Sequence, residues 1–157
     1  MNAELLSPSA VAGAATYRVV RGFFDEVRSG KRPELADRYM AQEVRAHQLT
    51  SEQPQVVLRS PANYAEHVRD FLAWWGPFTI EIDELLVDGD RAYVRWTQYG
   101  HHVAEPDGRP GSGRPIRETA SAVYRVAGER IVEYWIQTDR HGVLLQTSQA
   151  AEAESRG

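Results

Sequence analysis

The dipeptide Gly76-Pro77 separates two parts of the chain in which apolar residues repeat with different periods. Upstream of it, apolar residues recur at the spacing of amphipathic helices. Downstream, apolar and polar residues alternate, as they do in strands with one buried face. The alternating segments are residues 78–87, 91–102, 116–126 and 130–139. Because Asp88-Gly89-Asp90 and Ala127-Gly128-Glu129 suit tight turns, we expect helices followed by an antiparallel meander.

The upstream part predicts two long helices. Ser9 is suited to cap a helix from about Ala10 to Ser29, and Ser60 one from Pro61 to about Trp75. The connecting residues predict a short helix at 33–39, a short strand at 43–49 and a loop at 51–60.

Helices that are segregated from an antiparallel sheet define an α+β domain. We expect a curved antiparallel sheet wrapped around the long N-terminal helix, with an internal cavity between the concave face and the helices. A chain of 157 residues is long enough for one domain with its own core. We place this domain at residues 9–147, between flexible termini at 1–8 and 148–157.

Composition excludes several classes of function. The chain has no Cys, which excludes thiol catalysis, disulfides and Cys-ligated metals. The net charge is −4 and no basic run occurs, which argues against nucleic acid as a partner. The sequence has neither a secretion signal nor an apolar run that could cross a membrane, so we expect a cytoplasmic protein. The His spacing matches no known metal-binding pattern, so we predict no metal.

Asp139 is the first candidate for chemistry. It ends the last alternating segment and has the same parity as Ile131, Trp135 and Gln137. A carboxylate held beside a large aromatic wall loses hydration, which raises its pKa and suits it to proton transfer. The alternative is that Asp139 ends the strand at a surface turn and pairs with a nearby arginine.

Two histidines are further candidates, and a third is set aside. His102 has the parity of Trp96 and Gln98, so it could face the cavity and stabilise a developing oxyanion, or lie half-solvated at the strand end. His47 ends the short strand, where it could reach the cavity mouth or serve as a buried structural histidine bonded to a carbonyl group. His67 lies in the middle of a helix, offset from the apolar stripe, and we expect it to face solvent.

The aromatic residues are more numerous than a minimal core requires. A pocket lined by some of them suits a flat or apolar substrate with a few polar groups. The residues expected to contact such a substrate are Tyr17, Trp75, Trp96, Gln98, Trp135 and Gln137.

Several stretches together carry a family resemblance that extends over about residues 15–146. They are FFDEV at 23–27, YMAQEVRAH at 39–47, VDGDRAYVRW at 87–96, and RIVEYW at 130–135 followed by Asp139-Arg140. In this order the chain resembles the SnoaL-like polyketide cyclases of the nuclear-transport-factor-2-like superfamily. It departs from the commoner family pattern at 101–115 and at Arg117-Glu118-Thr119.

The resemblance implies a cone-shaped fold that forms a homodimer through the outer face of its sheet. It implies an aldol cyclase of secondary metabolism, such as antibiotic biosynthesis, that needs no cofactor and acts on a small apolar or aromatic-type substrate. An Asp at the position of Asp139 would act as general acid and base, and we expect His102 and His47 to assist.

Other activities share this scaffold, so two alternatives stay open. One is an epoxide-opening cyclase or epoxide hydrolase, which a second cavity carboxyl such as Glu118 or Glu133 would favour. The other is a non-catalytic ligand-binding dimer, which predicts a solvated Asp139 and a pocket without a group of perturbed pKa.

Overall fold

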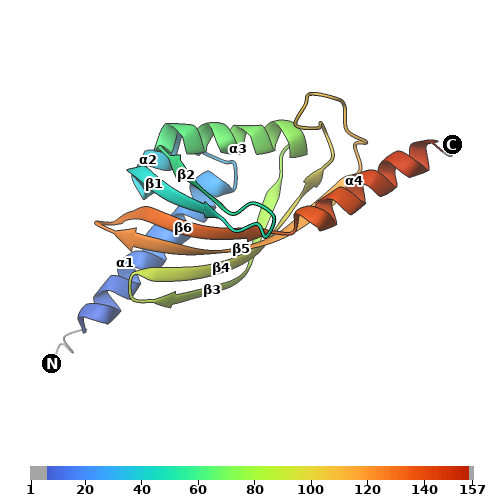
Figure 1. The fold of residues 1–157 in the computed structure, drawn as a ribbon. Coiled ribbons are helices and arrows are strands. Elements are labelled where there is room, and N and C mark those ends of the chain that lie inside the picture. The colour runs from blue at the N-terminus through green and yellow to red at the C-terminus, as the bar shows by residue number, and fades with distance from the viewer. Residues whose placement is uncertain (1–6, 156–157) are drawn as a thin grey trace.

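The computed structural model describes residues 7–155, with side chains described as far as Ser148 (Figure 1). The helices are α1 (Pro8–Gly22), a π-helix η1 (Phe23–Arg28), a 3-10 turn η2 (Pro33–Leu35), α2 (Ala36–Tyr39), α3 (Pro61–Trp75) and α4 (Arg140–Ser155). The strands are β1 (Met40–Gln48), β2 (Gln55–Arg59), β3 (Thr79–Asp88), β4 (Arg91–His101), β5 (Pro115–Ala127) and β6 (Arg130–Thr138).

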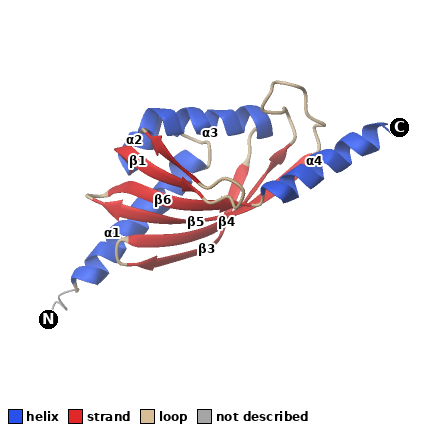
Figure 2. Cartoon of the chain, viewed as in Figure 1, coloured by secondary structure: helices blue, strands red, loops and turns tan. Residues whose placement is uncertain are grey.

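The strands form one curved six-stranded sheet in the order β2-β1-β6-β5-β4-β3 (Figure 2). Every neighbouring pair is antiparallel except β1 and β6, which run parallel. Helix α1 crosses β3 to β6, and α3 packs against β1 and β4, so both helices cover the same face of the sheet (Figure 1). This arrangement confirms the predicted α+β fold.

The core lies between α1 and the inner face of β4 and β5. On β4 the buried residues alternate as Ala92, Val94, Trp96 and Gln98, which is the pattern that the sequence predicts for a strand with one face inward. Phe24 packs its ring against that of Trp96 at 5.0 Å between centroids. The helix and the long strands thus bury their apolar faces against each other, which supplies most of the stabilisation of such a domain.

The sheet has one strand more than the sequence predicts. Residues 51–60 were expected to form a loop, but β2 pairs with β1 and places Val57 against the core. Pro54 lies just outside this edge strand, where a missing N–H breaks no ladder hydrogen bond.

The two ends of the fold also differ from expectation. Ser7 rather than Ser9 caps α1, because its hydroxyl accepts from the Ala10 N–H. Helix α4 continues through Ser155, where a flexible tail was expected from residue 148; Ala and Glu are strong helix formers. The remaining terminal residues, 1–6 and 156–157, lie outside the described part of the chain. None of the helices in the described part is long and apolar enough to cross a membrane.

Strand β6 contains a β-bulge that changes which side chains face inward. Ile131 pairs with Val126, and the next pair is Glu133 with Arg125. Strand β6 therefore has one extra residue here, Val132, which has no partner in β5. Ile131 and Tyr134 are therefore both buried, although they have opposite parity. Beyond the bulge the even-numbered residues of β6 face the interior.

Candidate functional site

An interior cavity of about 410 Å³ lies between α3 and the inner face of the sheet. Its wall on the α3 side is aromatic and its opposite wall carries polar groups. The described residues that line it are Arg28, Gln48, Tyr64, His67, Phe71, Trp74, Trp75, Pro106, Glu118, Tyr134, Ile136, Thr138, Arg140 and Val143. A largely apolar cavity with a few convergent polar groups is the usual form of a small-molecule site.

Glu118 is the one carboxyl among the described residues that line this cavity. It lies on the inner face of β5, directly opposite Gln98 of β4. Burial raises the pKa of its carboxyl, the charge of Asp139 adds to this effect, and the charge of Arg28 opposes it. A carboxyl group whose pKa is raised in this way is a candidate general acid and base.

His67 of α3 faces the same cavity, although the sequence led us to expect it in solvent. Its ring lies 5.9 Å from that of Tyr64 and 4.5 Å from that of Phe71, between centroids. Burial, together with the charges of Arg59 and Arg28, lowers the pKa of His67 to about 4, so the imidazole is neutral at pH 7. The spacing of three and four residues from Tyr64 and Phe71 is the signal that could have placed it on this face.

Arg28 is a buried cation that the sequence analysis did not single out. It ends the π-helix, a type of turn that often occurs at functional sites, and only 4% of its surface is exposed. Its guanidinium carbon lies 4.5 Å from the centre of the Phe71 ring and 5.8 Å from that of Trp96. From the sequence, a charged residue at the end of a helix is expected to be exposed to solvent. For this reason Arg28 was not among the predicted site residues.

Three predicted substrate-binding residues lie on the inner side. Trp75 lines the cavity, and Trp96 and Gln98 are buried on the inner face of β4. Neither polar atom of the Gln98 side chain has a hydrogen-bond partner among the described residues. Contact of these side chains with a ligand stays a prediction.

Two tyrosines extend the polar part of this region. Tyr134 of β6 lines the cavity, and Tyr124 of β5 lies next to it, with 5.4 Å between ring centroids. Burial raises the pKa of both phenols, so they remain protonated and can donate hydrogen bonds.

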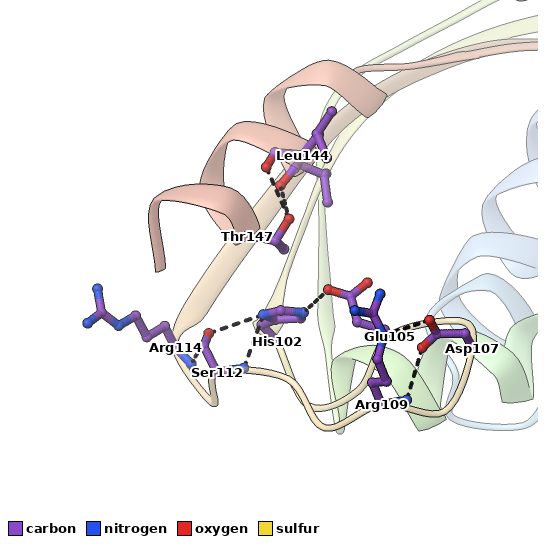
Figure 3. A network of polar contacts seen from close by, with 9 residues as sticks. His102, Glu105, Asp107, Arg109, Ser112, Arg114, Leu144 and Thr147 are labelled. Atoms are coloured by element: carbon purple, nitrogen blue, oxygen red, sulfur yellow. Dashed lines mark hydrogen bonds and ion pairs between the residues drawn. The ribbon is translucent and has the colours of Figure 1, made fainter. Parts of the chain in front are cut away.

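His102 lies outside this cavity, in a polar network within the loop that follows β4 (Figure 3). The Ser112 N–H donates to His102 Nδ1 at 3.1 Å, so the ring proton is on Nε2, which donates to Glu105 Oε1 at 2.8 Å. The inward parity of β4 does reach His102, but the strand ends at His101 and the chain turns away there. His102 therefore holds residues 102–114 together rather than facing the cavity with Gln98.

The bulge in β6 turns Trp135, Gln137 and Asp139 to the outer side, contrary to the expectation from simple alternation. Asp139 is exposed and caps α4, because its Oδ1 accepts from the Gly142 N–H at 3.0 Å. It borders a shallow outer groove with Thr119 and Thr97. This geometry corresponds to the turn that the sequence left open as the alternative.

His47 also lies on the outer side. Its ring stacks on Trp135 at 4.9 Å between centroids, and its Nε2 lies 2.7 Å from Glu133 Oε2. It thus has a carboxylate partner rather than the cavity or a carbonyl group. Tyr17 on α1 is half exposed and borders none of the cavity, so the structure does not bring the predicted catalytic and aromatic sets together.

Among the described residues, no three His, Asp or Glu side chains gather closely enough to hold a metal ion. The prediction of a metal-free site stays a prediction.

Comparison with known families identifies the family of the chain. A profile of the SnoaL-like polyketide cyclases matches residues 18–147. The chain belongs to the SnoaL-like polyketide cyclase family. This SnoaL-like chain has no match among curated protein sequences.

Solved structures place the SnoaL-like chain among proteins of the same fold. A candidate polyketide cyclase from Acidithiobacillus ferrooxidans is 28% identical, with a TM-score of 0.75 over 87% of this chain and 96% of that one. IdmH, a candidate polyketide cyclase from Streptomyces antibioticus, is 24% identical, with a TM-score of 0.69 over 83% and 96%. A protein from Catenulispora acidiphila with a ketosteroid-isomerase-like fold is 15% identical, with a TM-score of 0.63 over 83% and 92%.

Proposed function

We propose that the chain catalyses an aldol-type ring closure of an apolar carbonyl substrate, without a cofactor, and that Glu118 is the general acid and base. The observation that carries this proposal is a carboxyl group of raised pKa inside an aromatic-walled cavity of a SnoaL-like chain. The fold alone selects no chemistry, so the proposal depends on this site.

The reaction needs only proton transfers and one new carbon–carbon bond. Ionised Glu118 removes a proton from the carbon next to a carbonyl group, which leaves an enolate. The enolate carbon attacks a second carbonyl carbon of the same molecule, and the ring closes. The alkoxide that results takes the proton back from Glu118, so the enzyme is regenerated and the product is an isomer of the substrate.

The other cavity residues would hold the substrate in the folded shape that this reaction requires. The rings of Phe71, Trp74 and Trp75 offer flat apolar surfaces for a ring-bearing compound. Tyr134 can donate a hydrogen bond to a carbonyl oxygen, and neutral His67 can donate or accept one. Positioning of this kind brings the two reacting carbons together and supplies much of the acceleration in such reactions.

The cavity supports this chemistry over the two alternatives. Epoxide opening would be favoured by a second cavity carboxyl, and the described lining residues include only Glu118. The non-catalytic alternative predicts a solvated Asp139, which the structure has, but it also predicts a pocket without groups of perturbed pKa, whereas Glu118 and His67 both have one. The homodimer implied by the family resemblance stays a proposal.

Proton exchange at carbon tests the role of Glu118 even before the natural substrate is known. 2-Tetralone, a bicyclic aromatic ketone that stays un-ionised at pH 7, is incubated in D2O, and loss of its α-proton signal is followed by NMR. We expect the wild-type protein to catalyse exchange and Glu118→Gln to slow it by about 10²–10⁴-fold, the usual contribution of a general base. Asp139→Asn is the matched control, and it should retain the wild-type rate within a few-fold.

Wild-type exchange in Glu118→Gln, or its loss in Asp139→Asn, would contradict the proposal. Loss of exchange in Asp139→Asn would indicate that Asp139 is the general base.

A further inference from the structure

Among the described residues, Arg28 is a buried cation without an ion-pair partner within 4.0 Å, and this is an unusual state for an arginine. Within the described residues its guanidinium forms no ion pair, and its Nη1 has no hydrogen-bond partner. Buried charges are normally paired, because leaving water is costly for an ion. The aromatic rings of Phe71 and Trp96 offset only part of this cost.

The unpaired guanidinium belongs to the interior cavity rather than to a separate part of the core. Arg28 is among the residues that line the cavity, where its charge opposes the rise in the pKa of Glu118. Gln98, directly opposite Glu118 in the sheet, is the second fully buried polar side chain without a partner. Unsatisfied donors from η1 and β4 thus lie at the same end of the sheet as the proposed general base.

We propose that Arg28 binds an ionised oxygen of the substrate, a carboxylate or a stabilised enolate, and that Gln98 assists. The inference rests on the proposed function for the location of the substrate, and it narrows the substrate class to apolar ring compounds with one acidic group. The planar guanidinium matches the two oxygens of a carboxylate or of a 1,3-diketone enolate.

An equilibrium binding experiment tests this without turnover. The probes are 2-naphthoate, the enolate-forming 2-acetylindane-1,3-dione, and neutral 2-acetylnaphthalene, with affinities measured by calorimetry at pH 7. We expect the wild-type protein to bind at least one of the two anions 10-fold or more tightly than the neutral ketone. The tighter anion identifies the acidic group as carboxylate or enolate.

Three variants separate the effect of Arg28 from that of the general charge of the cavity. Arg28→Met keeps the length and apolar contacts, and it should lose the preference for anions while retaining affinity for 2-acetylnaphthalene. Arg140→Met removes another cation of the same lining, which is exposed and paired with Glu52, and it should keep the preference. Arg28→Lys keeps the charge, and it should keep a weakened preference.

Thermal stability distinguishes a binding role from a structural one. If Arg28 serves the ligand, Arg28→Met removes an unpaired buried charge and the melting temperature should stay equal or rise. A lower melting temperature with anion preference intact would overturn the proposal, as would equal affinities for all three probes in the wild type. Because Glu118→Gln leaves Arg28 in place, it should still bind the anion, so failure of either proposal can be recognised separately.

Discussion

Glu118 and His67 share one cavity, but their ionisation affects stability with opposite sign. The raised pKa of Glu118 means that the folded chain holds this proton more tightly than the unfolded chain does. Its contribution to stability is full at low pH and is lost as pH rises through the folded pKa. The lowered pKa of His67 means that its contribution is full above its ordinary value and is lost as pH falls.

The pH dependence of stability therefore reports on His67. Between its ordinary pKa of 6.5 and its folded value of about 4, the unfolded state takes up a proton that the folded state does not. Between pH 7 and pH 5 the wild-type protein should lose about 2 kcal/mol of unfolding free energy relative to His67→Gln. Urea unfolding at both pH values measures this difference.

His141→Gln is the control for that experiment, since His141 is exposed. It should follow the wild-type pH dependence. Parallel curves for wild type and His67→Gln would show that the ring is hydrated in solution.

At the scale of single residues, the sequence predicted which strand residues lie on the inner side of the sheet, but not which helical residues line the cavity. Trp96 and Gln98 follow directly from alternation along β4, because one face of a strand is either in or out. Whether His67 and Arg28 face the cavity depends on how much of the circumference of α3 and η1 the cavity borders. The packing between elements determines this extent. A polar residue on the margin of an apolar stripe is ambiguous in sequence.

Among the elements, β6 shows how one residue can change the assignment of a site. Val132 is β-branched, as Ile131 before it is, so nothing in its chemistry marks the bulge. The bulge exchanges the two faces of the strand beyond it, which takes Trp135 and Asp139 away from the cavity and brings Tyr134 in. Period-two reasoning fails wherever a bulge occurs.

Helix α4 gives Asp139 a structural role that can be measured. Its carboxylate caps the helix, and a Cβ at Gly142 would collide with it, which accounts for the glycine there. Asp139→Ala should lower the unfolding free energy by about 1 kcal/mol, whereas Asp139→Asn should be nearly neutral because Asn caps equally well. Circular dichroism in urea gives both values, and equal losses in the two variants would argue against capping.

At the scale of the whole molecule, the loop at residues 102–114 joins β4 to β5 and also contributes to the wall of the cavity. Gly and Pro are frequent at residues 105–115, so from the sequence alone we expect a flexible connection there. The structure instead ties the loop through His102, through the bridge between Ala104 and Pro110, and through backbone hydrogen bonds. Pro106 reaches the cavity lining, so the conformation of this loop affects the shape of the site.

Removal of the His102 ring should loosen that loop without disturbing the sheet. His102→Ala deletes the hydrogen bonds to Ser112 and Glu105. We expect amide hydrogen exchange at residues 103–113 to accelerate by about 10-fold or more, with β4 and β5 unchanged. His101→Ala is the control, because His101 is exposed at the end of β4. Unchanged exchange in His102→Ala would mean that the backbone alone holds the loop.

The overall topology was predictable where it depends on neighbours in sequence and not where it depends on distant partners. The meander of β3 to β6 follows from alternation along consecutive strands and from the tight turns that join β3 to β4 and β5 to β6. The parallel pairing of β1 with β6 joins segments about ninety residues apart, and β2 becomes a strand only because β1 offers it an edge. Such long-range pairings leave no local pattern.

The placement of the four tryptophans makes the protein its own optical probe. Trp74 and Trp75 line the cavity, Trp96 is buried behind it, and Trp135 lies on the outer face beneath Arg91. A compound that enters the cavity displaces water from two of the four indole rings, so its arrival shifts and quenches the intrinsic emission. Unlabelled compounds can be ranked by fluorescence titration before any product is known, and Trp135→Phe would remove the background from the outer face.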